Sequence, residues 1–148
     1  MTRRHVFFDC EGATLVGTVD EAAGTSGLLI VSGGNELRSG AWSGQAQLAA
    51  RVAREGFPVM RFDRRGVGDS SGPNGEFRSS APDISAALAA FRAECPQLAR
   101  IVGHGNCDGA SALMLSDGAG CDALVLSNPW TIEDDEAPSP PEVLRDHY

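Results

Sequence analysis

The sequence predicts an α/β fold, a mostly parallel sheet with an antiparallel hairpin at its N-terminal end. From residue 27 onward, apolar runs typical of buried strands alternate with stretches of helical spacing in the order β-α-β-α-β-α-β. Before them, two short runs at 5–10 and 13–19 flank the turn Glu11-Gly12, which indicates a hairpin. Helical crossovers between parallel strands cover both faces of a sheet, so we expect a three-layer α/β/α sandwich.

Each element has its own signal in the sequence. The expected strands after the hairpin are Gly27–Ser32, Pro58–Asp63, Arg100–Gly103 and Asp122–Ser127, and all are apolar runs typical of buried strands. The first helix is expected at 43–55, ended by Gly56, with a buried face of Leu48, Ala49, Val52 and Ala53. The second begins at Ser80, stops at Cys95-Pro96 and buries Ile84, Leu88 and Phe91. A third is expected at 109–116, ended by Gly118.

Length and charge narrow the class of protein. A chain of 148 residues is expected to form one domain with a real core. The net charge is -8, and all 12 basic residues are arginine. This acidic balance argues against nucleic acid and against an anionic membrane surface as partners.

The four cysteines, at 10, 95, 107 and 121, are widely spaced. No C-x-x-C pair or His/Cys cluster suggests a metal, and we expect neither metal nor cofactor. The cysteines therefore indicate free thiols in a reducing compartment. No run is long enough to span a bilayer, and the N-terminus lacks the apolar core of a signal peptide. These features predict a cytoplasmic protein without a membrane span.

The helix and strand pattern ends near Trp130. We expect residues 1–130 to form the core and residues 131–148 to form an acidic, Pro-rich tail, the start of a cap or a linker. The last strand, around Leu124–Leu126, then has no neighbour on its outer edge. An uncovered apolar edge is a liability, so we expect a second copy of the chain or a further C-terminal segment to cover it.

The segment 105–109, Gly-Asn-Cys-Asp-Gly, stands between an expected strand and an expected helix. A nucleophile on such a sharp turn needs glycines two residues before and two after it, because the backbone is crowded on both sides. The following helix also directs its positive N-terminal end at the same point. Cys107 is therefore the candidate nucleophile, and the alternative is a small buried cysteine in a tight turn.

The sequence resembles the α/β-hydrolase fold over residues 5–130. The resemblance rests on the Gly33-Gly34 loop, the Gly-rich loop at 63–72 and the turn at 105–109, in this order and at these intervals. The segments 106–111 and 126–130 are also similar to hydrolase 1 of the exosortase A system, a family of bacterial exopolysaccharide and protein-sorting gene clusters. The fold places its catalytic acid after a sixth or seventh strand and its histidine after an eighth. The resemblance thus implies an N-terminal portion with an incomplete triad.

The expected active site combines Cys107 with an oxyanion hole. The backbone N–H of Asp108 and one from the turn Gly34-Asn35 are the candidate oxyanion donors. For Gly33-Gly34 the alternative is an ordinary turn that needs positive φ. No histidine is well placed as a base: His104 lies on the strand end and is interpreted as structural, His5 is on the first strand, and His147 is in the tail.

Three functions follow as hypotheses. The first is a hydrolase or acyltransferase that acts on a small acyl ester or thioester through Cys107, incomplete or inactive as this chain. The second is a non-catalytic hydrolase fold that binds a partner. The third is a nucleotide-binding α/β domain, suggested by the spacing Gly103/Gly105/Gly109, which is similar to dinucleotide-binding loops.

Overall fold

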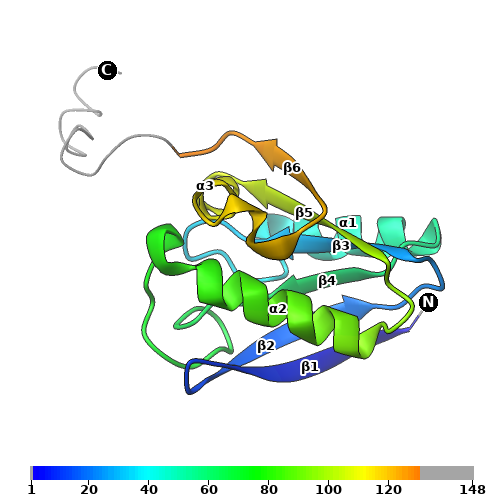
Figure 1. The fold of residues 1–148 in the computed structure, drawn as a ribbon, viewed down its shortest axis with the longest axis horizontal. Coiled ribbons are helices and arrows are strands. Elements are labelled where there is room, and N and C mark those ends of the chain that lie inside the picture. Colours follow the sequence, from blue (N-terminus) through cyan, green and yellow to red (C-terminus); the bar gives the residue numbers. More distant parts are fainter. Residues whose placement is uncertain (1, 131–148) are drawn as a thin grey trace.

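The computed structural model describes residues 2–130 and contains a single six-stranded sheet (Figure 1). Its strands are β1 (Arg3–Cys10), β2 (Ala13–Asp20), β3 (Ser26–Val31), β4 (Val59–Phe62), β5 (Arg100–Asn106) and β6 (Ala123–Ser127). The helices are α1 (Gly44–Arg54), α2 (Ala81–Glu94) and α3 (Asp108–Leu115), with short 3-10 turns η1 (Ala41–Ser43), η2 (Phe77–Ser79) and η3 (Asp117–Gly120).

The strands lie in the order β1-β2-β4-β3-β5-β6. β1 pairs antiparallel with β2, and β2 pairs antiparallel with β4. β4, β3, β5 and β6 are parallel, with Leu28 opposite Val59 on one side and Val102 on the other. The predicted α/β sheet with an N-terminal antiparallel hairpin is confirmed.

The helices cover the sheet from both sides. In Figure 1, α2 and α3 lie in front of the sheet and α1 lies behind it. The larger core fills the space beneath α2 and α3, where Ile84, Leu88 and Phe91 are buried as predicted. The smaller core joins Ala49 of α1 to Ile30 and Val59. The three-layer arrangement follows from the apolar runs, because each central strand must bury both of its faces.

Two predictions about burial were wrong. Leu48 was expected on the buried face of α1, but it is exposed, and Ala50 is buried in its place. The strand at 122–127 was expected to be buried, but Leu124 and Val125 of β6 are 38% and 54% exposed. The reason is position: β6 ends the sheet within residues 2–130, so it has a neighbour on one side only. What covers this edge stays a prediction, and the tail expected at 131–148 lies outside the described residues.

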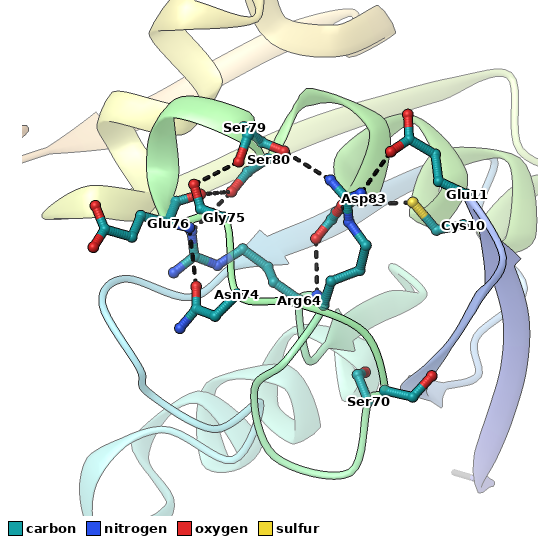
Figure 2. Close-up of polar contacts among 12 residues, drawn as sticks. Cys10, Glu11, Arg64, Ser70, Asn74, Gly75, Glu76, Ser79, Ser80 and Asp83 are labelled. Atoms are coloured by element: carbon teal, nitrogen blue, oxygen red, sulfur yellow. Dashed lines mark hydrogen bonds and ion pairs between the residues drawn. The ribbon is translucent and has the colours of Figure 1, made fainter.

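The Gly-rich loop after β4 is fixed by ion pairs on both sides. Asp63 is fully buried and accepts hydrogen bonds from the backbone N–H of Arg38 at 2.7 Å and of Asp69 at 3.1 Å. Arg65 donates to Asp83 of α2 at 2.6 Å. Asp83 Oδ1 also accepts a hydrogen bond from the Cys10 thiol, at 3.5 Å from Sγ (Figure 2). These contacts give Asp63, Arg65 and Asp69 structural roles in the loop.

The buried Cys10 thiol makes stability depend on alkaline pH. Burial, and then the Asp83 carboxylate, raise the pKa of Cys10 to about 11. An ordinary thiol pKa is 9.0, so the unfolded chain releases this proton from about pH 9, and the folded state loses about 2 kcal/mol of stability as the pH rises toward 11. Urea unfolding at pH 8 and pH 11 should show this loss, and Cys10→Ala should reduce it. The same loss in the variant would contradict the assignment.

Within residues 2–130, no helix has both the length and the apolar character needed to cross a bilayer.

Candidate active site

The turn between β5 and α3 holds Cys107 in a strained backbone conformation. Its φ and ψ are 55° and -127°, a region that side-chain-bearing residues rarely occupy. β5 ends at Asn106 and α3 begins at Asp108, so Cys107 is the single residue that reverses the chain. The sharp strand-to-helix turn expected at this position is present.

The two glycines of this turn are needed because backbone packs on backbone. A Cβ on Gly105 would lie 2.5 Å from the carbonyl carbon of Gly109. A Cβ on Gly109 would lie 2.2 Å from the carbonyl oxygen of Val31, the last residue of β3. The glycine spacing therefore reports a real steric constraint, and the turn rests directly against the end of β3.

The loop after β3 lies against the same turn. A Cβ on Gly33 would lie 2.8 Å from the carbonyl oxygen of Asn106, 3.3 Å from the Asp108 nitrogen and 3.4 Å from Cys107 Cβ. The next residue, Gly34, has a φ of +52°. Close packing on Gly33 thus carries Gly34 and Asn35 to the edge of the Cys107 site.

A cavity of about 500 Å³ opens at this point. It brings together all four residues that the sequence proposed for the site, Cys107, Asp108, Gly34 and Asn35. Its other walls are residues that sequence reasoning missed: Arg64, Asn74, Glu76, Phe77 and Trp130. Ser111 of α3 donates to the Trp130 carbonyl at 2.6 Å, which holds the chain after β6 over this end of α3.

Backbone donors of both loops at the cavity have no acceptor. Within residues 2–130, the N–H groups of Gly34, Asn35 and Asp108 make no hydrogen bond. Asp108 is the first residue of α3, where the N–H groups of a helix have no partner in the helix itself. These free donors, beside a half-buried thiol, are the arrangement that stabilises a developing oxyanion.

The thiols differ in their surroundings. Cys107 lines the cavity, and its Sγ lies 3.9 Å from Asp108 Oδ1, which is long for a hydrogen bond. Burial raises the pKa of each of the other three cysteines, those at 10, 95 and 121, above the ordinary value of a thiol. All four cysteines are free.

The structure brings no described histidine to Cys107. The His104 ring nitrogen Nδ1 lies 3.1 Å from the carbonyl oxygen of Val125 in β6. The His5 ring contacts Thr18 Oγ1 at 3.0 Å, on the strand pair at the far side of the sheet. The structural interpretation of His104 agrees with these contacts, and His147 lies outside the described residues. Within residues 2–130, no three His, Cys, Asp or Glu side chains are grouped as metal ligands.

A family model described as "Alpha/beta hydrolase family" matches residues 28–147. The match covers well over half of the chain, which therefore belongs to the α/β-hydrolase family. No curated protein matches.

Several solved structures share the fold. The α/β hydrolase GrgF from Penicillium sp. sh18 is 23% identical with a TM-score of 0.78, and the alignment covers 99% of this chain and 53% of GrgF. The Pyrococcus furiosus esterase Pf2001 is 20% identical with a TM-score of 0.76, over 99% of this chain and 59% of the esterase. XC6422 from Xanthomonas campestris, a serine hydrolase without a lid, is 19% identical with a TM-score of 0.68, over 89% of this chain and 65% of its own. The chain thus spans 53–65% of the length of these structures.

The packing of the turn predicts a selective cost for one glycine. Gly109→Ala should destabilise the protein by about 3 kcal/mol, because its methyl group meets the Val31 carbonyl and the end of β3 cannot move away. Gly44→Ala is the matched control, since Gly44 has helical φ and ψ and a methyl group there would have no other atom within 4 Å. It should be neutral or stabilising by up to about 1 kcal/mol. Urea unfolding measures both, and equal effects would contradict the packing.

Proposed function

We propose that this α/β-hydrolase chain provides the nucleophile and the oxyanion hole for acyl transfer from an ester or thioester, with Cys107 as the nucleophile. The observation that carries the proposal is the strained Cys107 turn beside unpaired backbone donors at one cavity. A thiolate attacks acyl carbon more readily than an unassisted hydroxyl does. The esterase among the structures of the same fold agrees with this class of substrate.

The proposed reaction has two steps. The Cys107 thiol gives its proton to a base, and Sγ bonds to the acyl carbon, so the carbonyl oxygen becomes an oxyanion. This intermediate collapses, the bond to the leaving oxygen or sulfur breaks, and the protonated base returns its proton to the leaving group. Water then attacks the thioester on Cys107, which releases the carboxylic acid and restores the thiol. We place the base outside residues 2–130, since no described histidine reaches Cys107.

In the proposed reaction, the negative charge of the oxyanion forms beside backbone N–H groups that are already in place, so the loops need not rearrange to stabilise it. The N–H of Asp108 and one N–H of the turn Gly34-Asn35 are the proposed donors. Loss of one such donor in a comparable site slows acyl transfer about 100-fold to 1,000-fold. The N-terminal end of α3 adds a favourable dipole at the same point.

The cavity favours a compact and polar acyl substrate. Asn35, Asn74 and Glu76 supply polar walls, and Phe77 and Trp130 supply aromatic ones. Its volume of about 500 Å³ lies within the range of small-molecule sites.

Other parts of the functional hypothesis stay predictions. The link to exosortase and exopolysaccharide systems rests on segments 106–111 and 126–130 alone, and a cytoplasmic location rests on the sequence.

The non-catalytic alternative would show a Cys107 that reacts no faster than the other cysteines, and size-exclusion chromatography would report a partner copy. A nucleotide-binding domain would be stabilised by nucleotides in a thermal-shift assay.

Iodoacetamide should label Cys107 before the other cysteines in the folded protein at pH 8. The thiolate is the reactive form, and the raised pKa values of Cys10, Cys95 and Cys121 keep those thiols protonated at this pH. Peptide mapping over time should give a rate at Cys107 at least about 10-fold above the others. The matched control is Cys121→Ala, which should leave the Cys107 rate unchanged, whereas equal labelling of all four cysteines would overturn the proposal.

Short acyl donors should acylate Cys107 faster than long ones. We expect p-nitrophenyl acetate to react at least about 10-fold faster than the palmitate ester, because the polar walls at Asn35, Asn74 and Glu76 give a long apolar chain few favourable contacts. Release of p-nitrophenolate measures the rate, and Cys107→Ala should abolish its fast phase. A preference for the long ester would contradict the assigned cavity.

A further inference from the structure

The structure assigns a further role to Arg64: it is the positioning residue that holds the oxyanion loop in its productive shape. The oxyanion loop is defined here as Gly33, Gly34 and Asn35. This inference rests on the proposed function and adds a residue that neither the glycine pattern nor the nucleophile position identifies.

Arg64 connects three parts of the site. Its Nη2 donates to the Gly34 carbonyl, and its Nη1 donates to Ser80 Oγ at 2.9 Å, immediately before α2. Ser80 Oγ in turn donates to the Glu76 carbonyl at 2.6 Å, as Figure 2 shows. One guanidinium group, which also lines the cavity, therefore connects the oxyanion loop to the start of α2.

The oxyanion loop needs such an anchor. Two consecutive glycines give this segment large conformational freedom, and Gly34 adopts a positive φ. Gly33 is fixed by close packing against the Cys107 turn, and its carbonyl accepts the Glu36 N–H at 3.0 Å. The peptide between Gly34 and Asn35 contains the Gly34 carbonyl and the Asn35 N–H, one of the two candidate oxyanion donors of this turn. Arg64 holds this carbonyl, and because the peptide is planar it thereby fixes the direction of the Asn35 N–H. Asn74 supplies a second contact, because its side-chain amide donates to Asn35 Oδ1 at 2.7 Å.

The guanidinium group of Arg64 donates its hydrogen bonds to uncharged acceptors, the Gly34 carbonyl and the Ser80 hydroxyl. The neighbouring arginines have a carboxylate within 4 Å: the half-buried Arg65 has Asp83, and the buried Arg61 has Asp20. Arg64 is 4% exposed and has no such ion pair within residues 2–130. Burial lowers the pKa of its guanidinium, and the charges of Asp108, Asp83 and Glu76 oppose this shift from longer range. A buried arginine remains protonated, so its charge is compensated by its two hydrogen-bond partners, the Gly34 carbonyl and the Ser80 hydroxyl.

Acylation and alkylation of Cys107 separate a positioning role from a change in the thiol. Both reactions consume the thiolate, but only acylation passes through an oxyanion, so the ratio of the two rates at one pH reports the oxyanion hole. In Arg64→Met of the full chain, the rate with p-nitrophenyl acetate should fall about 10-fold to 100-fold, while the rate with iodoacetamide stays within about twofold.

Two further variants guard against loss of structure. Arg65→Met removes the adjacent arginine, which is ion-paired to Asp83 and does not line the cavity, so it should keep the wild-type ratio of rates. Ser80→Ala keeps the charge of Arg64 but removes one of its two anchors, and it should lower the ratio about twofold to fivefold.

The outcomes are distinct. An unchanged ratio in Arg64→Met and Ser80→Ala overturns the role of Arg64 and leaves the proposed function standing. An equal fall of both rates in Arg64→Met overturns it too, because the change then lies in the thiol. A lower ratio caused only by weaker binding of the ester, with an unchanged rate at saturation, would make Arg64 a substrate contact and also overturn it. A wild-type Cys107 that is alkylated but never acylated overturns the proposed function as well.

Discussion

Direct backbone-to-backbone contact between the β5–α3 turn and the end of β3, with no side chain between them, determines the geometry of the whole site. Gly109 lies so close to the Val31 carbonyl that no side chain fits between them, because a Cβ would lie 2.2 Å from the carbonyl oxygen. Gly33 has a similar contact, since its Cβ would lie 2.8 Å from the Asn106 carbonyl oxygen. These contacts fix the height of Cys107 above the sheet and force its strained φ and ψ. The strain can persist because the two flanking strands pair along their length. A one-atom addition at this point would separate Cys107 from the loop after β3.

Two kinds of feature could be predicted from the sequence. One is the tight turn, where steric exclusion requires glycine, and the other is the set of central strands, which are buried on both faces of the sheet. The glycines at 105 and 109 appear in the sequence because backbone contact excludes any Cβ, so the turn could be located from the pattern alone. The central strands could be placed because burial on both faces demands apolar runs, as in Leu28–Val31. Expected and observed boundaries differ by one or two residues in most elements, and β5 continues three residues beyond Gly103 to Asn106.

The residues that line the cavity are harder to predict from the sequence, because their position depends on tertiary packing rather than on a local pattern. Arg64 follows Asp63 at the carboxyl end of a parallel strand, and this position is a usable signal, because such ends meet at one edge of the sheet. Asn74 and Glu76 come from the long loop between β4 and α2, which carries no periodic pattern. Exposure of Leu124 and Val125 likewise could not be deduced from an apolar run, since it depends on what lies beside β6. Local composition predicts burial only where a neighbouring element is present to cover the strand.

The central claim is that Cys107 accepts an acyl group because it stands beside free backbone donors. The most direct measurement is peptide mapping by mass spectrometry after brief exposure of the folded chain to p-nitrophenyl acetate at pH 8. The account predicts an acetyl group on the peptide that contains Cys107, with Cys10, Cys95 and Cys121 unmodified. Acetyl groups distributed over all four cysteines, or absent from Cys107, would contradict it.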